Sequence, residues 1–154
     1  MSIPFLIRQI FHNFPLISAI VALLFCQFFK CIFESVKQRK IKFFTFFSPG
    51  GVISSHIAST TSLTLALGIK YGFESGIFAL SSVFLGIVIF DAVVVREEAA
   101  RHGEILNRIL KELFMKKKID GEVFREVLGH SPFEAFWGIL VGIFIPLFLK
   151  KFFF

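Results

Sequence analysis

The sequence predicts an all-α integral membrane protein with about four transmembrane helices plus a cytoplasmic amphipathic helix, folded as a single membrane domain over residues 1–154. Three observations support this class. Of the 154 residues, 55% are hydrophobic and only 18% are charged, which is too apolar for a soluble domain of this size. The mean hydropathy of +0.77 indicates that much of the surface faces a medium other than water. The apolar residues also gather in runs of about 20, the length that crosses a bilayer core as a helix.

Four runs are long enough to span a membrane: residues 14–33, 52–69, 76–95 and 133–149. No small-residue cleavage pattern follows the first run, so we expect it to be retained as a span rather than removed as a signal peptide. The stretch before it, around Arg8, is too short to cross and suits an interfacial helix. In the polar loop 96–132, apolar residues recur at helical spacing from Ile105 to Phe114, which predicts an amphipathic helix lying on or just under the membrane.

The placement of basic residues predicts the orientation of the spans. Most Lys and Arg residues lie in the loop after the first span and in the loop 96–132. Because basic residues near spans are retained in the cytoplasm, we expect both loops inside the cell and both termini outside, in the plasma (inner) membrane. The net charge of +6 does not indicate nucleic acid binding, because the basic residues lie beside the spans, where anionic lipid headgroups account for them.

Unusual polar residues occur at the ends of all four spans, on the same basic side of the membrane. They are Lys30 in the first span, Ser54, Ser55 and His56 at the start of the second, Asp91, Arg96 and His102 around the end of the third, and His130 and Glu134 at the start of the fourth. Polar groups at this depth need internal partners or a ligand. Basic side chains, hydroxyls and helix N–H groups bind a tetrahedral oxyanion, while two histidines supply a nucleophile and an acid. This set suits hydrolysis of a phosphomonoester without a metal.

Structural explanations of the same residues remain open. The serines would then cap a helix while His56 packs against a neighbour, and Asp91 with Arg96 would form an ion pair. Asp91, Glu134 and the histidines also offer ligands for a metal. No ligand-pair motif such as HExxH is present, however, so we expect neither a metal nor a cofactor.

Several of these residues lie in motifs that resemble a known family. The motifs are Gly50-Gly51-Val52-Ile53-Ser54-Ser55-His56, Asp91-Ala92 followed by Val95-Arg96, Leu106-Asn107, and Leu128-Gly129-His130-Ser131-Pro132-Phe133-Glu134. In this order and spacing they resemble the divergent type-2 phosphatidic acid phosphatase family, which is related to integral lipid phosphatases and vanadium haloperoxidases. The resemblance covers nearly the whole chain, from Gln27 to Gly138.

The resemblance implies a role for each candidate residue. The catalytic residues would be His102, which attacks phosphorus, His56, which protonates the leaving lipid alkoxide, and Asp91; the substrate-binding residues would be Lys30, Ser54, Ser55, Arg96 and His130. The chain departs from the family pattern at Ile53, where a proline is expected, and at Leu106, where an aspartate is expected. On an unbroken helix Arg96 and His102 would lie about 120° apart, so they converge only if the chain bends between them. Without a bend, His130 is the next candidate to act with His56.

We therefore expect a membrane lipid phosphomonoester phosphatase that acts at the cytoplasmic leaflet through a histidine nucleophile, on a lipid such as phosphatidylglycerophosphate or phosphatidate. The alternative is a non-catalytic lipid-phosphate-binding membrane protein derived from such an enzyme, which the departures from the motifs favour. Transport is a weaker alternative, because four short spans leave little room for a pathway. Gly138 and Gly142 would allow close helix packing within the chain or in a homo-oligomer, and we favour the first.

Overall fold

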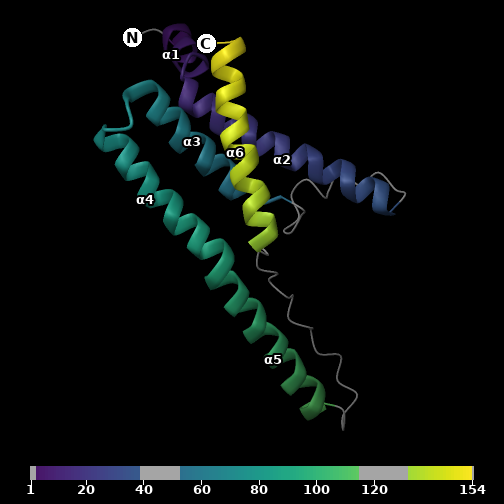
Figure 1. The fold of residues 1–154 in the computed structure, drawn as a ribbon. Coiled ribbons are helices and arrows are strands. Elements are labelled where there is room, and N and C mark those ends of the chain that lie inside the picture. Colours follow the sequence, from purple (N-terminus) through teal and green to yellow (C-terminus); the bar gives the residue numbers. More distant parts are fainter. Residues whose placement is uncertain (1–2, 39–52, 115–131, 154) are drawn as a thin grey trace.

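The computed structural model describes residues 3–38, 53–114 and 132–153, and Figure 1 shows their arrangement. The elements are the helices α1 (Ile3–Phe11), α2 (Phe14–Gln38), α3 (Ser55–Tyr71), α4 (Gly76–Phe90), α5 (Arg96–Phe114) and α6 (Pro132–Phe152), with a π-helical turn, η2 (Asp91–Val95), between α4 and α5. These ranges contain no strand. The predicted all-α class is therefore confirmed.

Helix α3 is the central helix of the bundle and contacts α2, α4 and α6. It is rich in small and hydroxylated residues, and two of its hydroxyl groups bond to the backbone of neighbouring helices. Ser59 Oγ donates to the carbonyl oxygen of Ala19 in α2, and Thr64 Oγ1 donates to that of Ser81 in α4, both at 3.1 Å. In a bilayer core, where water is absent, such bonds compensate the polarity of this helix.

Two glycines of α6 allow it to lie close to α3. A Cβ atom at Gly142 would lie 2.5 Å from Thr61 Cβ and 2.7 Å from the carbonyl oxygen of Ala58, while one at Gly138 would lie 2.8 Å from that of Ser54. Real Cβ atoms do not approach other atoms so closely, so only glycine fits at either position. The GxxxG pair thus packs within the chain, the alternative favoured from the sequence.

Among the described residues, three helical segments are long and apolar enough to cross a membrane: Phe14–Val36, Gly76–Ile109 and Pro132–Phe152. They include the predicted first, third and fourth spans. The predicted second span, residues 52–69, corresponds to α3, which has 17 residues and does not meet the same criterion. The structure thus differs from four equivalent spans, because α3 is shorter and more polar and lies enclosed by the others.

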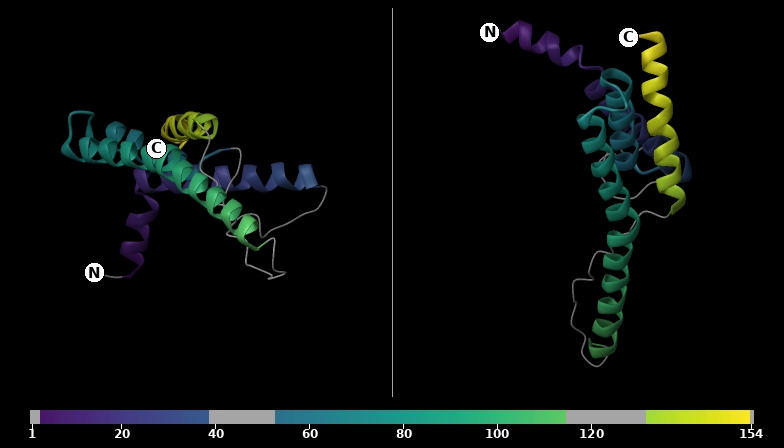
Figure 2. Two further views of the ribbon diagram at one scale, coloured as in Figure 1. Left: turned by 90° about the horizontal axis from the view of Figure 1, so that it is seen from below. Right: turned by 60° about the vertical axis from the view of Figure 1, so that its left-hand side comes forward.

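Helices α4 and α5 join through η2 into one continuous rod (Figure 2). The three elements have 15, 5 and 19 residues, which corresponds to about 58 Å at about 1.5 Å per residue. This length exceeds the thickness of a bilayer core, about 30 Å, and α5 extends beyond the other helices (Figure 2). The helix predicted in the loop 96–132 is present as α5, and it continues the line of α4 instead of folding back against the bundle.

The helices alternate in direction, and this brings together the helix ends that carry the candidate residues. Both termini lie at one end of the bundle, where α3 ends and α4 begins (Figure 1). The start of α3, the end of α4 and the start of α6 therefore lie at the other end. An apolar cluster of Ile57, Ala92 and Ala135, one residue from each of α3, η2 and α6, packs there. This cluster fixes the elements that form the site described next.

Candidate functional site

A pocket of about 280 Å³ lies where the first turn of α3 faces the junction of α4 and η2. Its lining consists of His56, Ile87, Val88, Asp91, Ala92 and Arg96. Three of these residues are polar and three are apolar. Ala92 also belongs to the apolar cluster, so part of the pocket wall is held by the packing of α3, η2 and α6.

Ser54 sets the position of the first turn of α3. Its backbone is extended, with φ −73° and ψ 108°, and its hydroxyl oxygen accepts a hydrogen bond from the backbone N–H of Ile57 at 3.5 Å, as an N-cap residue does. The backbone N–H of Ser54 donates to the carbonyl oxygen of Glu134 in α6 at 3.2 Å. The side chain is fully buried, so this helix start is anchored to α6 and holds the exposed His56 in the first turn.

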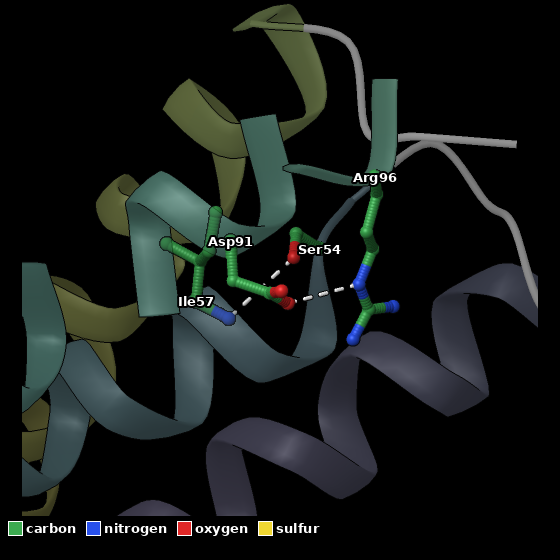
Figure 3. A network of polar contacts seen from close by, with 4 residues as sticks. All are labelled: Ser54, Ile57, Asp91 and Arg96. Carbon is green, nitrogen blue, oxygen red and sulfur yellow. Dashed lines mark hydrogen bonds and ion pairs between the residues drawn. The ribbon is translucent and has the colours of Figure 1, made fainter. Parts of the chain in front are cut away.

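Asp91 and Arg96 are joined by two hydrogen bonds across η2. The backbone N–H of Arg96 donates to the carbonyl oxygen of Asp91, and the Nε group of Arg96 donates to Oδ2 of Asp91 at 3.1 Å (Figure 3). In an α-helix, residues five apart lie about 140° apart around the axis, so their side chains would not meet. The wider π turn places both on one side of the rod, and that side faces the pocket.

The structure brings together only part of the predicted site. His56, Asp91 and Arg96 share the pocket, with Ser54 and Ser55 at the adjoining start of α3. Lys30 is buried in α2 at 8% exposure and does not line the pocket.

His102 lies apart from the pocket. Helix α5 is unbroken from Arg96 onward, so the bend that would bring His102 beside Arg96 is absent, and the His102 side chain is exposed. His102 lies six residues after Arg96, which corresponds to about 9 Å of rise along the helix axis. His130, the other predicted histidine, lies outside the described residues. The role of each as a catalytic or binding group stays a prediction.

Two features of the pocket were not predicted. One is its apolar wall, formed by Ile87, Val88 and Ala92; nothing distinguishes these residues from the rest of an apolar span. The other is the π turn, for which the spacing of five residues between Asp91 and Arg96 was an available signal, because an ion pair at that spacing requires a wider turn.

The electrostatic character of the pocket suits an anion. The guanidinium of Arg96 and the first-turn N–H groups of α3 provide positive potential and donors, and the His56 imidazole adds a further group that can form a hydrogen bond. Asp91 partly offsets the charge of Arg96. Among the described residues, no group of three or more His, Cys, Asp or Glu side chains is placed to hold a metal ion.

The chain is similar over most of its length to known membrane proteins. The model of the family described as "Divergent PAP2 family" matches residues 11–145. A relative, "Uncharacterized membrane protein YuiD" of Bacillus subtilis (strain 168), is 33% identical over 156 residues, which cover 94% of this chain and 99% of the relative. No solved structure matches the chain. The motifs around His56 and Arg96, the all-helical bundle and the extent of both matches lead to one conclusion: this membrane protein belongs to the divergent PAP2 family.

Proposed function

We propose that this protein is a lipid phosphatase, a phosphoric monoester hydrolase that removes phosphate from a membrane lipid at the cytoplasmic leaflet. One observation supports the proposal above others. His56 from α3 and Arg96, the first residue of α5, line the same pocket, although they are far apart in the sequence. A guanidinium group, an imidazole and a helix N-terminus in one pocket can together bind a phosphomonoester.

The proposed chemistry uses each polar group for one task. Arg96 and the first-turn N–H groups of α3 bind the phosphoryl oxygens and stabilise the charge that develops in the transition state. His56, in its protonated form, donates a proton to the leaving lipid alkoxide. Their positions allow both groups to act on one phosphate.

The nucleophile in this proposal is His102, with His130 as the alternative. Attack of an imidazole nitrogen on phosphorus forms a phosphohistidine and breaks the bond to the lipid oxygen, and water then releases phosphate. In the described structure, His102 reaches the pocket only after a rearrangement of the first turns of α5. A His102→Ala variant should therefore lose turnover and retain binding of the lipid phosphate.

The apolar side of the pocket supports a lipid as the substrate. Ile87 lines the pocket and continues an exposed apolar face of α4 that includes Leu80 and Val83, with exposed fractions of 60%, 71% and 65%. A face this apolar is stable against acyl chains and not against water. A lipid whose phosphate lies at Arg96 could extend its chains along α4.

Phosphate release is the decisive test. Detergent-purified protein would be given phosphatidate, phosphatidylglycerophosphate and a soluble phosphomonoester, with a chelator present. We expect release from a lipid phosphate that survives chelation, is inhibited by vanadate, and falls at least about 100-fold in His56→Ala and Arg96→Ala. His12→Ala is the matched control, because His12 bonds to the Arg8 carbonyl between α1 and α2, at the opposite end of the bundle. Equal activity of all the variants would refute the proposed site.

A non-catalytic protein that binds lipid phosphates is the second candidate. It is favoured by the position of His102, which is exposed on α5 and does not line the pocket with His56. It is also favoured by departures from the motif pattern at Ile53, Val95 and Leu106, where a proline, a serine and an aspartate are expected. In the same assay, a binder would show Arg96-dependent association with the lipid and no release of phosphate from any substrate.

A further inference from the structure

We propose that one acyl chain of the lipid lies along the open side of α3, between α2 and α4, while its phosphate lies in the pocket. The inference rests on the proposed function and concerns the part of the substrate that the pocket does not hold. The open side of α3 and its border on α4 are called the chain track here. It consists of Thr60 and Leu63 of α3 and Leu80 and Phe84 of α4.

Three sides of α3 are covered by the helices that it contacts. Helix α6 approaches Ala58 and Thr61 through its glycines, and α2 and α4 accept the two hydroxyl bonds described above. At about 100° per residue, Thr60 and Leu63 point to the side opposite α6. Both are half-buried, whereas Ala58 and Thr61 are buried. The fourth side of α3 is therefore the open one.

The open side of α3 begins at the pocket. His56 lines the pocket and is exposed, and Thr60 and Leu63 follow it at spacings of four and three residues, which places all three on one side of the helix. Helix α3 starts at the pocket and runs toward the end of the bundle that carries the termini (Figure 1). Between His56 and Leu63 it rises by about 10 Å. The chains of a lipid whose phosphate is in the pocket extend in this same direction, from the headgroup toward the bilayer midplane.

Helix α4 provides an apolar border for the track. The pocket joins α3 to α4 at Ile87, and a hydrogen bond joins the same two helices at Ser81. Phe84 and Leu80 lie three and seven residues before Ile87, on the same side of α4, and both are exposed. The apolar wall of the pocket thus continues along α4 at the levels that the open side of α3 occupies.

The track is suited to a hydrocarbon chain because it offers no free hydrogen-bonding group. Thr60 carries its one hydroxyl, which already donates to the carbonyl oxygen of His56 at 2.8 Å. Lipid tails are as apolar as these side chains, so a chain gains little hydrophobic free energy by moving from the bilayer into the track. The track acts through shape instead, because it lets the phosphate reach Arg96 while the chain remains among apolar groups. A bulky side chain in the track should therefore exclude lipids more than small phosphomonoesters.

Photo-crosslinking tests the position of the chain directly. A phosphatidate with a diazirine in one acyl chain would be mixed into phosphatidylcholine nanodiscs that hold the protein, and peptide mass spectrometry would identify the labelled residues. We expect labels within residues 60–63 and 80–84 at about fivefold or more above those from a phosphatidylcholine with the same diazirine chain. Arg96→Ala removes the contact to the phosphate and should abolish this excess.

Leu63→Trp fills the track, and Leu140→Trp is the matched control. Leu140 is exposed and lies two residues from each α6 glycine that contacts α3, so it points away from α3. We expect Leu63→Trp to lower the preference for phosphatidate over glycerol 3-phosphate, measured as the ratio of kcat/KM values, by about fivefold or more. Leu140→Trp should keep this ratio within about twofold.

The remaining outcomes separate the track from the proposed function. Equal labelling by the two probes would make the track ordinary lipid-facing surface, and labelling by neither would mean that a second copy of the chain or another segment covers it; either result overturns the inference. Labelling that depends on Arg96, without release of phosphate from any lipid, supports the track and refutes the phosphatase. Release of phosphate with equal preferences in Leu63→Trp and Leu140→Trp supports the phosphatase and refutes the track. The comparison of the two probes uses the unmodified protein, so it does not depend on the folding of a variant.

Discussion

Replacing Gly142 by alanine tests the close contact between α3 and α6. The added Cβ atom would lie 2.5 Å from Thr61 Cβ and 2.7 Å from the backbone oxygen of Ala58. Carbon atoms in favourable contact lie about 3.5–4.0 Å apart, so the two helices must separate by about 1 Å. Because the Ala58 oxygen belongs to the backbone, a change of rotamer cannot relieve the overlap.

Two opposing effects determine how much Gly142→Ala changes the free energy of unfolding. Overpacking of a tight helix contact costs about 1–3 kcal/mol, and alanine recovers up to about 1 kcal/mol over glycine in a helix. We expect the free energy of unfolding to fall by about 1–2 kcal/mol. For a chain of this size, that change lowers the thermal midpoint by about 2–8 °C.

The control is Gly86→Ala in α4. No atom of the described residues lies within 4 Å of a Cβ built at Gly86, so this substitution brings the same helix propensity without the overlap. Thermal unfolding in one detergent, followed by circular dichroism, should show a lower midpoint for Gly142→Ala and an equal or higher midpoint for Gly86→Ala. Equal midpoints for the two variants would contradict the described contact between α3 and α6.

Three further predictions concern α3 and the orientation of the chain. Thr64→Val removes the hydroxyl that donates to the Ser81 carbonyl oxygen and should lower the free energy of unfolding by about 1 kcal/mol. The control is Ser82→Ala, which removes a hydroxyl that bonds within α4. If Thr64→Val lowers the free energy of unfolding no more than Ser82→Ala does, the interhelical bond is contradicted. Ser54→Ala removes the N-cap and should cost about 1 kcal/mol, with weaker lipid phosphate binding as the first turn of α3 loosens; unchanged unfolding and binding would show that the cap contributes nothing. A reporter enzyme fused within residues 115–131 should be active only in the cytoplasm, and activity outside would refute action at the inner leaflet.

The sequence predicted the helical class and the elements that meet at the pocket for identifiable physical reasons. Long apolar runs must form helices in a bilayer, and successive spans must alternate in direction. These two constraints place the start of α3 beside the end of α4, and so predict that His56, Asp91 and Arg96 lie at one end of the bundle. The pocket lining agrees with that placement.

The direction of α5 could not be predicted from the same information. An apolar repeat at helical spacing, such as that between Ile105 and Phe114, is identical in a helix that lies on a membrane and in one that continues a span. The segment between Asp91 and Arg96 contains neither proline nor glycine to end the helix. The chain therefore continues through a π turn, and the pattern of residues does not specify that continuation.

The role of the hydroxyl groups in the predicted second span could not be assigned for a related reason. Residues 52–69 form an apolar run interrupted by hydroxyls, and from composition alone those hydroxyls pointed to a ligand. In the structure, Ser59 and Thr64 bond to carbonyl groups of α2 and α4, so part of this polarity is structural. Contacts between helices decide which polar groups are needed for folding, and a single sequence does not show them.

The enclosure of α3 has a consequence for how the protein enters the membrane. This helix does not meet the length and composition criterion met by three other described segments, and its buried Thr64 hydroxyl bonds to the backbone of α4. Released alone from the insertion machinery into lipid, it would be only marginally retained. We expect it to enter the bilayer together with α2 and to be secured when α6 is synthesised and packs against it. Substitutions at the contact between α3 and α6 should therefore produce chains with mixed topology, in addition to chains of lower stability.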